Sequence, residues 1–355
     1  MNLHFVKLGM SRGIQSNMSG LRFRIAAVLW ATLAAATVPA PHPAETPGRL
    51  TVPVTVVQAD LHHPGTLLAG TAAAQLFRSR DGAENWTPLA FPLAFRSTLH
   101  TILIDPSIPD TYLVGLSSET PENAGVFRTT DEGATWHRLH GLERNQIWAL
   151  ALWTGDSHVI AAGTPEGVFR TLDGGQSWTH LGGADSARPR PVVSLAFDPK
   201  DRNTLYAGTP HLAWKTSDGG ASWHRLSRGM QADSDIFSID VDPNQRGRLF
   251  AGACGGLYRS LDGGGTWSTL ERAIGGPFRT YAVARAPGLH GVVFAATSSG
   301  LIRSSDGGVT WQRVSTEPAR SIAFDPADAR RIFVATDHGV ILSEDAGLHF
   351  RGAGA

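Results

Sequence analysis

Seven aspartates recur along the chain at near-regular intervals, each inside a short polar motif. Carboxylates can hold a cation or act as general acid and base when several of them converge. The intervals are 50, 42, 45, 44, 44 and 39 residues, which predicts one aspartate per structural repeat and no convergence. We therefore interpret these residues as structural rather than catalytic or metal-binding. They are Asp81, Asp131, Asp173, Asp218, Asp262, Asp306 and Asp345.

Arginines between the repeats are the second group of residues that could do chemistry. A guanidinium group binds a carboxylate through two parallel hydrogen bonds, so a ring of arginines would suit an acidic partner. Tyr281 follows one of these arginines by two residues and is placed with them. The sequence predicts a partner-binding surface made of Arg96, Arg144, Arg190, Arg228, Arg279, Tyr281 and Arg320.

Another basic residue stands at one position ahead of six of the seven motifs. Because it recurs at the same place in each repeat, we predict a structural role, pairing with backbone carbonyls or with neighbouring repeats. The 14 histidines show no spacing typical of metal ligands, and His62 and His63 would point to opposite sides of a strand. We expect no metal and no cofactor. The recurring basic residues are Arg78, Arg128, Arg170, Lys215, Arg259 and Arg303.

The elements that must position these residues are β-strands. Each motif reads Ser/Thr-x-Asp-x-Gly-x-Thr/Ser-Trp and lies between two runs of alternating apolar residues, which is typical of a hairpin. The aspartate can accept N–H groups of the turn, and the glycine supplies a positive φ. The tryptophan begins the returning strand and offers an apolar face to a neighbouring sheet. Six of the ten tryptophans take this position: Trp86, Trp136, Trp178, Trp223, Trp267 and Trp311.

Two further strand-like runs precede each motif, and the first often ends in Asp-Pro, as in VVSLAFDP and IFSIDVDP. Each repeat of about 44 residues therefore has four antiparallel strands, here called A to D, which is the composition of one propeller blade. Seven such blades predict an all-β, seven-bladed β-propeller with the motif in each C–D turn. The A–B and C–D turns should share one face, and the B–C loops and D–A segments should share the other. We expect partner binding on that second face.

The seven motifs resemble the Asp-box, also called the bacterial neuraminidase repeat. In overall layout the chain is similar to the photosystem II stability and assembly factor family, whose members are single non-catalytic propellers. That resemblance implies a basic face that holds a membrane-protein assembly intermediate. More distantly the chain resembles sialidases and xyloglucan-active glycosidases. A sialidase would use an arginine triad and a tyrosine, for which Arg279 and Tyr281 are candidates, but no Phe/Tyr-Arg-Ile-Pro signature occurs near the first blade.

The amino-terminal region reads as a leader. An apolar run at residues 25–38 follows Arg22 and Arg24 and precedes small residues, which predicts a signal peptide cleaved after Ala36 or Ala40. We therefore predict a leader at 1–40, a Pro-rich linker at 41–50 and the propeller at 51–355. The mature protein would be exported, either periplasmic or secreted.

Composition narrows the function classes. Formal net charge is zero and pI is about 7.3, which gives no indication of nucleic-acid binding. The single Cys254 cannot form an internal disulfide, and we expect it to be a buried residue at a strand end. We predict a monomeric, non-catalytic scaffold that binds a protein such as a membrane-protein assembly intermediate. A glycoside hydrolase or carbohydrate-binding propeller is the alternative, with a glycan as ligand.

Overall fold

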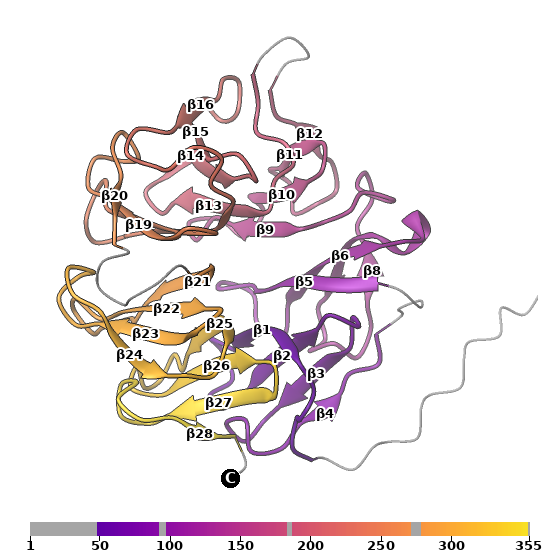
Figure 1. The fold of residues 1–355 in the computed structure, drawn as a ribbon. Coiled ribbons are helices and arrows are strands. Elements are labelled where there is room, and N and C mark those ends of the chain that lie inside the picture. Colours follow the sequence, from indigo (N-terminus) through magenta and orange to yellow (C-terminus); the bar gives the residue numbers. More distant parts are fainter. Residues whose placement is uncertain (1–47, 92–96, 183–186, 271–277, 354–355) are drawn as a thin grey trace, which may run out of the picture. The chain divides into compact units, whose positions relative to one another are not determined.

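The computed structural model describes residues 48–91, 97–182, 187–270 and 278–353. Within them the chain forms seven four-stranded antiparallel sheets, and in each sheet the strands pair in the order in which they follow one another in sequence. The first strands of neighbouring sheets contact one another around the ring, so they are the innermost strands (Figure 1). The predicted seven-bladed β-propeller is confirmed.

Strands A and B form the inner half of each blade. The A strands are β1 (Val54–Ala59), β5 (Ser97–Ile104), β9 (Ala149–Leu152), β13 (Ser194–Asp198), β17 (Ile236–Val241), β21 (Thr280–Arg285) and β25 (Ala319–Phe324). The B strands are β2 (Leu67–Thr71), β6 (Tyr112–Ser118), β10 (Ile160–Thr164), β14 (Asp201–Gly208), β18 (Leu249–Ala253), β22 (Val293–Thr297) and β26 (Ile332–Thr336).

Strands C and D form the outer half. The C strands are β3 (Leu76–Ser79), β7 (Gly125–Thr129), β11 (Gly167–Thr171), β15 (Ala213–Thr216), β19 (Gly256–Ser260), β23 (Gly300–Ser304) and β27 (Gly339–Ser343). The D strands are β4 (Thr87–Pro88), β8 (His137–Arg138), β12 (Thr179–His180), β16 (His224–Leu226), β20 (Ser268–Thr269), β24 (Gln312–Ser315) and β28 (Arg351–Gly352). A 3₁₀ helix, η1 (Pro121–Asn123), lies in the B–C connection of the second blade.

The B strands show why small residues recur in this sequence. All five residues of β2, β10, β18, β22 and β26 are buried, because both faces of the strand pack against neighbouring blades. A Cβ at Gly70 would lie 2.6 Å from Leu99 Cδ2 of the next blade, and one at Gly115 would lie 2.7 Å from Ile147 Cγ2. The small-residue step therefore allows the next A strand to approach closely.

Two details of the strands differ from the prediction. The motif tryptophan does not begin strand D but lies immediately before it, and most D strands contain only two residues. The reason is that the tryptophan ring packs on the preceding blade: Trp223 lies with Leu181 and Val168, and Trp311 with Phe250. Once its ring is buried there, only a short edge strand remains to pair with strand C.

The ring closes where the first and last blades meet, and Figure 1 shows these two blades, in indigo and yellow, side by side. All four strands of the seventh sheet come from the carboxyl-terminal segment. Leu50 packs with Val340 and Leu342 of that blade. A Cβ at Gly339 would lie 1.9 Å from the Leu50 carbonyl oxygen, just as one at Gly300 of the sixth blade would collide with its own D strand. The segment before β1 thus completes the outer end of the seventh blade.

Candidate functional site

The Asp-box turn is built in the same way in every blade. In the sixth blade the Asp306 carboxylate accepts hydrogen bonds from the Thr310 N–H (2.8 Å) and the Thr310 hydroxyl (2.6 Å), and from the Ser304 hydroxyl (2.8 Å). These bonds stabilise the ionised form and lower the pKa of Asp306. Hydrogen bonds from Thr129 and Thr135 likewise lower the pKa of Asp131 to about 2. Each aspartate is occupied by its own turn and is not available for catalysis.

Two successive residues of each turn have positive φ, as Gly174 (73°) and Gly175 (93°) do. The sequence predicted this only for the second of them, and Ala83 has φ 77° there in the first blade. The first of them has a carbonyl that accepts a hydrogen bond from the basic residue of the preceding blade, at 2.7 to 3.4 Å. The predicted structural role is confirmed at five of six positions. The pairs are Arg78–Glu132, Arg170–Gly219, Lys215–Gly263, Arg259–Gly307 and Arg303–Ala346.

The A–B turns lie on the same face as the Asp-boxes, as predicted. In every blade the turn between A and B accepts a backbone hydrogen bond from the Asp-box, for example Gly82 N–H to the Gly65 carbonyl (2.9 Å) and Gly307 N–H to the Gly291 carbonyl (2.8 Å). The B–C turns therefore form the opposite face, where the sequence placed the partner.

Several of the predicted arginines lie beside B–C turns. Arg144 pairs with Glu122 of η1 (3.2 Å), and Arg320 pairs with Asp337 (3.2 Å). The exposed Arg279 donates its N–H to the Ser298 hydroxyl oxygen (3.1 Å), and its carbonyl accepts the Ser298 N–H (2.9 Å). Each of the two ion pairs neutralises part of the charge on its guanidinium group.

Two of the predicted arginines are not seen beside B–C turns. Arg96 lies outside the described residues. The carbonyl of Arg228 accepts a hydrogen bond from the Trp267 N–H (2.8 Å), which places Arg228 beside the outer strand β20. The segment after β16 thus runs against the end of the Asp-box hairpin of the next blade at this point.

A backbone irregularity brings two of the predicted partner-binding residues, Tyr281 and Arg320, together with Phe237. Strands β17, β21 and β25 each carry a bulge at their second residue, and these residues are Phe237, Tyr281 and Arg320. The Arg320 guanidinium carbon lies 4.7 Å from the centre of the Tyr281 ring, and the Phe237 and Tyr281 rings are 5.8 Å apart. A bulge re-aims its side chain out of the blade, so three adjacent blades supply one aromatic and cationic cluster.

A basic pocket lies between the third and fourth blades on the B–C face. Its volume is about 280 Å³, and Arg188, Arg190, His211 and Arg225 line it together with Trp214. The Arg225 guanidinium stacks 4.9 Å above the Trp214 ring, since the two residues are cross-strand neighbours on β15 and β16. No carboxylate is among the lining residues that the structure describes.

Sequence reasoning identified Arg190 but missed His211 and Arg225. His211 belongs to the B–C turn of the fourth blade, and its Nδ1 lies 3.5 Å from an oxygen of Asp233. The signal for Arg225 was present: it follows the Asp-box Trp223 by two residues, so hairpin register places it opposite Trp214. No sequence pattern indicated that the segment around Arg190 lies next to the β15–β16 hairpin.

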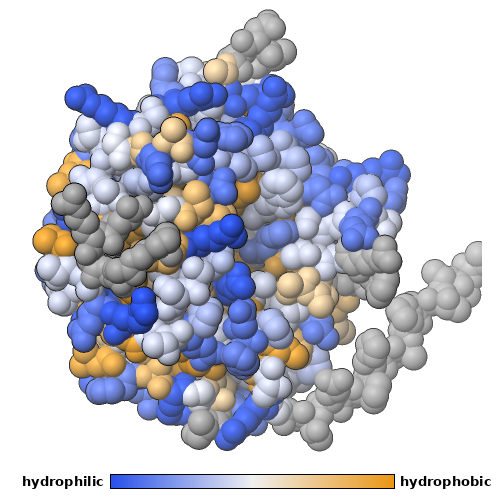
Figure 2. Space-filling view, viewed as in Figure 1, coloured by the Kyte–Doolittle hydropathy of each residue, from blue (hydrophilic) through white to orange (hydrophobic). Residues whose placement is uncertain are grey.

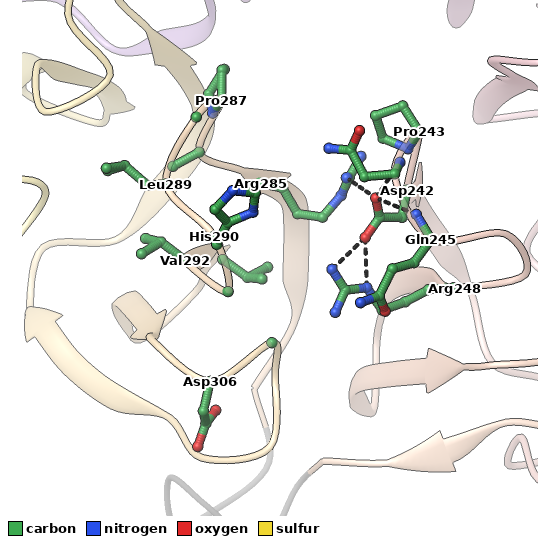
Figure 3. A pocket seen from close by; sticks show the side chains of 16 residues that line it. Asp242, Pro243, Gln245, Arg248, Arg285, Pro287, Leu289, His290, Val292 and Asp306 are labelled. Carbon is green, nitrogen blue, oxygen red and sulfur yellow. Dashed lines mark hydrogen bonds and ion pairs between the residues drawn. The ribbon is translucent and has the colours of Figure 1, made fainter.

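A larger cavity, of about 550 Å³, lies on the Asp-box face between the fifth and sixth blades. The sequence predicted only the A–B and C–D turns on this face, with partner binding on the other. In Figure 3 Arg285 and Arg248 approach Asp242 from two sides, while Asp306 lies apart from them. Arg285 bonds to Asp242 Oδ1 (2.8 Å), and Arg248 Nε bonds to Asp242 Oδ2 (2.6 Å). The charges at this cavity are thus already paired within the protein.

Two smaller expectations are corrected. Cys254 is not a buried strand residue but lies half-exposed in the turn after β18, where its sulfur accepts the Asp235 N–H (3.4 Å). His62 and His63 lie in the turn after β1 rather than on a strand. Both expectations failed because the strands end earlier than their apolar pattern indicates.

The surface offers no single apolar region in the view of Figure 2, where apolar groups are small and lie among polar and charged residues. In the described part of the chain, no helix has the length and apolar character required to cross a membrane.

Residues 143–293 match the family described as Photosynthesis system II assembly factor YCF48. No curated protein matches the sequence. The YCF48 structure from Cyanidioschyzon merolae has a TM-score of 0.62 and 19% identity, covering 85% of this chain and 98% of that one. A structure of YCF48 bound to D1 peptide has a TM-score of 0.63 and 17% identity, covering 84% and 95%.

The fold is also similar to that of a larger enzyme, the GH74 xyloglucanase from Xanthomonas campestris. It has a TM-score of 0.69 and 20% identity over 86% of this chain, and the chain spans about half the length of that enzyme (54%). At such identities these likenesses show the fold alone. The protein is therefore an Asp-box seven-bladed β-propeller whose residues 143–293 match the YCF48 assembly-factor family.

Proposed function

We propose that this protein is an exported, non-catalytic scaffold that binds a protein partner on its B–C face. The observation that carries the proposal is the basic pocket between the third and fourth blades, which three arginines and a histidine line and whose described lining residues include no carboxylate. Guanidinium groups bind carboxylates bidentately, so an acidic segment of a protein, or its terminal carboxylate, fits this chemistry.

Two further features support a protein partner. The cluster of Phe237, Tyr281 and Arg320 offers aromatic and cationic contacts on neighbouring blades, and such residues are enriched where proteins bind one another. YCF48, whose fold this chain shares, has been solved with D1 peptide bound. The partner class we propose is a membrane protein caught during assembly, and we propose with it that the leader expected at 1–40 exports the scaffold to the periplasm or outside the cell.

A glycoside hydrolase is the second candidate, because the fold is shared with xyloglucanases. The larger cavity argues against catalysis there. Burial disfavours the charge of Asp242, but hydrogen bonds from the Asn244 N–H and Arg248, together with the Arg285 charge, outweigh this and lower its pKa. The pKa of Asp306 is lowered by its Asp-box partners. A general acid requires a raised pKa, so neither carboxylate suits that role.

Site-specific photo-crosslinking in host envelope membranes tests the proposal. A benzoylphenylalanine at His211, on the basic pocket, should give one discrete adduct with a membrane protein. The adduct should disappear with the double substitution Arg190→Glu/Arg225→Glu and at high salt, because screening weakens exposed charge contacts. The matched control carries the crosslinker at Leu348, which is 54% exposed on the Asp-box face.

Equal adducts from both positions, or none from His211, would contradict partner binding at this pocket. Hydrolysis of a sialoside or a β-glucan by the purified protein would move the conclusion to the enzyme alternative.

A further inference from the structure

Three turns meet at the junction of the first and second blades on the Asp-box face. His63 comes from the turn between β1 and β2, Asp110 from the turn between β5 and β6, and Glu132 from the Asp-box of the second blade. Their ligand atoms lie within 4.8 Å of one another. His63 Nε2 is 3.4 Å from Asp110 Oδ1 and 3.5 Å from Glu132 Oε1.

The imidazole of His63 is oriented by a buried carboxylate. Its Nδ1 lies 3.2 Å from Asp60 Oδ2, and the Asp60 side chain has no exposed surface. Asp60 is itself fixed by the Tyr112 hydroxyl (2.7 Å) and by the His62 N–H (2.8 Å). A carboxylate that accepts the Nδ1 proton leaves the Nε2 lone pair free to bind a metal, which is the arrangement found around metal-bound histidines.

Glu132 and Asp110 each have one carboxylate oxygen that faces His63 Nε2. Glu132 Oε2 is taken by Arg78 and Arg80, which leaves Oε1 facing His63. Asp110 Oδ1 is shielded from solvent and accepts no hydrogen bond in the part of the chain that the structure describes. One nitrogen and two oxygens thus converge from three separate turns.

The two separations between His63 Nε2 and the carboxylate oxygens match the size of a metal site. For bonds of about 2.0–2.1 Å in tetrahedral geometry, neighbouring ligand atoms lie roughly 3.3 Å apart. The two measured separations from His63 Nε2 are 3.4 and 3.5 Å. Histidine nitrogen combined with carboxylate oxygen is a ligand set that Zn²⁺ and similar divalent transition metals accept, whereas Mg²⁺ and Ca²⁺ favour oxygen alone.

We propose that His63, Asp110 and Glu132 bind one divalent transition-metal ion of the Zn²⁺ class, with a fourth position left to water. The ion would join the first blade to the second at a junction distant in sequence from the basic pocket. The competing state is a protonated His63 that pairs with both carboxylates, and the metal must displace this proton.

No sequence pattern indicates this site, because its ligands are spread over 70 residues and three turns. Glu132 occupies the first positive-φ position of its Asp-box (55°), where five of the other six blades have glycine. Only the second blade therefore presents a carboxylate at that point.

The test is metal titration of the mature, tag-free protein after treatment with a chelator. Calorimetry with Zn²⁺ and absorption spectroscopy with Co²⁺ at about pH 7.5 should both show one ion per chain. His63→Ala and Glu132→Gln should each weaken binding by at least about 10-fold, since each removes a ligand. His158→Ala is the matched control, because His158 lies in the equivalent turn of the third blade and, among the described residues, forms its one ion pair with Asp156.

Circular dichroism of each variant shows whether the fold is kept, so a loss of binding can be separated from unfolding. Binding that is unchanged in His63→Ala, or equally weakened in His158→Ala, would overturn the proposal. No detectable Zn²⁺ binding at concentrations up to about 1 mM would overturn the proposal as well, because a specific site would bind Zn²⁺ with a dissociation constant below that concentration.

Discussion

Replacing Arg285 with methionine should destabilise the junction between the fifth and sixth blades strongly. The Arg285 guanidinium contacts Asp240 Oδ2 (2.5 Å), Asp242 Oδ1 (2.8 Å) and the Val241 carbonyl (2.6 Å). The Asp242 side chain is 1% exposed, so the variant leaves one buried carboxylate with Arg248 alone and removes the guanidinium partner of Asp240. Breaking a buried ion pair by removing one partner costs about 3–5 kcal/mol.

This cost can be expressed as a change in melting temperature. With an unfolding entropy of about 2.1 cal/mol/K per residue over roughly 300 residues, 1 kcal/mol corresponds to about 1.6 °C. Arg285→Met should therefore lower Tm by about 5–8 °C in a calorimetric scan. Arg313→Met, an exposed arginine on the outer strand β24, is the control and should change Tm by less than about 1 °C.

The pH dependence of the same variant gives a second measurement. Burial raises the pKa of Asp240, with Arg285 opposing the shift, so removing Arg285 should raise that pKa further. A carboxyl group whose pKa is raised by folding destabilises the fold at neutral pH and ceases to do so as pH falls. The Tm difference from wild type should therefore narrow as the pH falls below neutral. A variant no less stable than Arg313→Met, or a gap that widens on acidification, would refute the reasoning.

Three other predictions concern the repeated turns. Hydrogen bonds lower the pKa values of the Asp-box carboxylates, to about 2 for Asp131 and Asp262. Their contribution to the free energy of unfolding is therefore fully present above about pH 4 and should be lost as the pH approaches 2, so a constant Tm across that range would be inconsistent with this. Gly264→Ala should cost about 1–3 kcal/mol, because φ is 90° and the new Cβ would lie 2.6 Å from a leucine methyl, whereas Gly288→Ala, also at positive φ but in open space, should cost less in the same melting assay. Arg303→Met removes the hydrogen bond to the next blade (3.0 Å) and should lower Tm by about 1–2 °C, which a scan with no shift would disprove.

The blade architecture was predictable because one physical unit is repeated seven times. The Asp-box residues fix a turn, the turn fixes the C–D hairpin, and the alternating runs before it supply the inner strands. Strand order alone predicted that the A–B and C–D turns share one face of the propeller, and the backbone hydrogen bond from the Gly82 N–H to the Gly65 carbonyl confirms it. Even the structural role of the basic residues such as Arg303 could be inferred, since a position that recurs in each blade meets the same neighbour each time.

The sites were less predictable, because each is made of residues that the repeat does not specify. The basic pocket requires the segment around Arg190 to reach the hairpin of the next blade, and only the packed fold sets that distance. The carbonyl of Arg228, which follows β16, lies instead against the Trp267 N–H beside the outer strand β20, because loop paths do not follow the repeat. The bulge that places Tyr281 beside Arg320 is likewise invisible in an alternating strand pattern.

The most direct test of partner binding at the B–C face is the affinity of the crosslinked partner, once purified, measured at low and at high salt. Wild type and Arg313→Glu should bind equally well at low salt and lose affinity as salt rises. Arg190→Glu/Arg225→Glu should bind weakly at low salt and depend little on salt, because it lacks the charges that salt screens. Unchanged affinity in this double variant, with the salt dependence of wild type, would contradict the assignment of the basic pocket as the binding site.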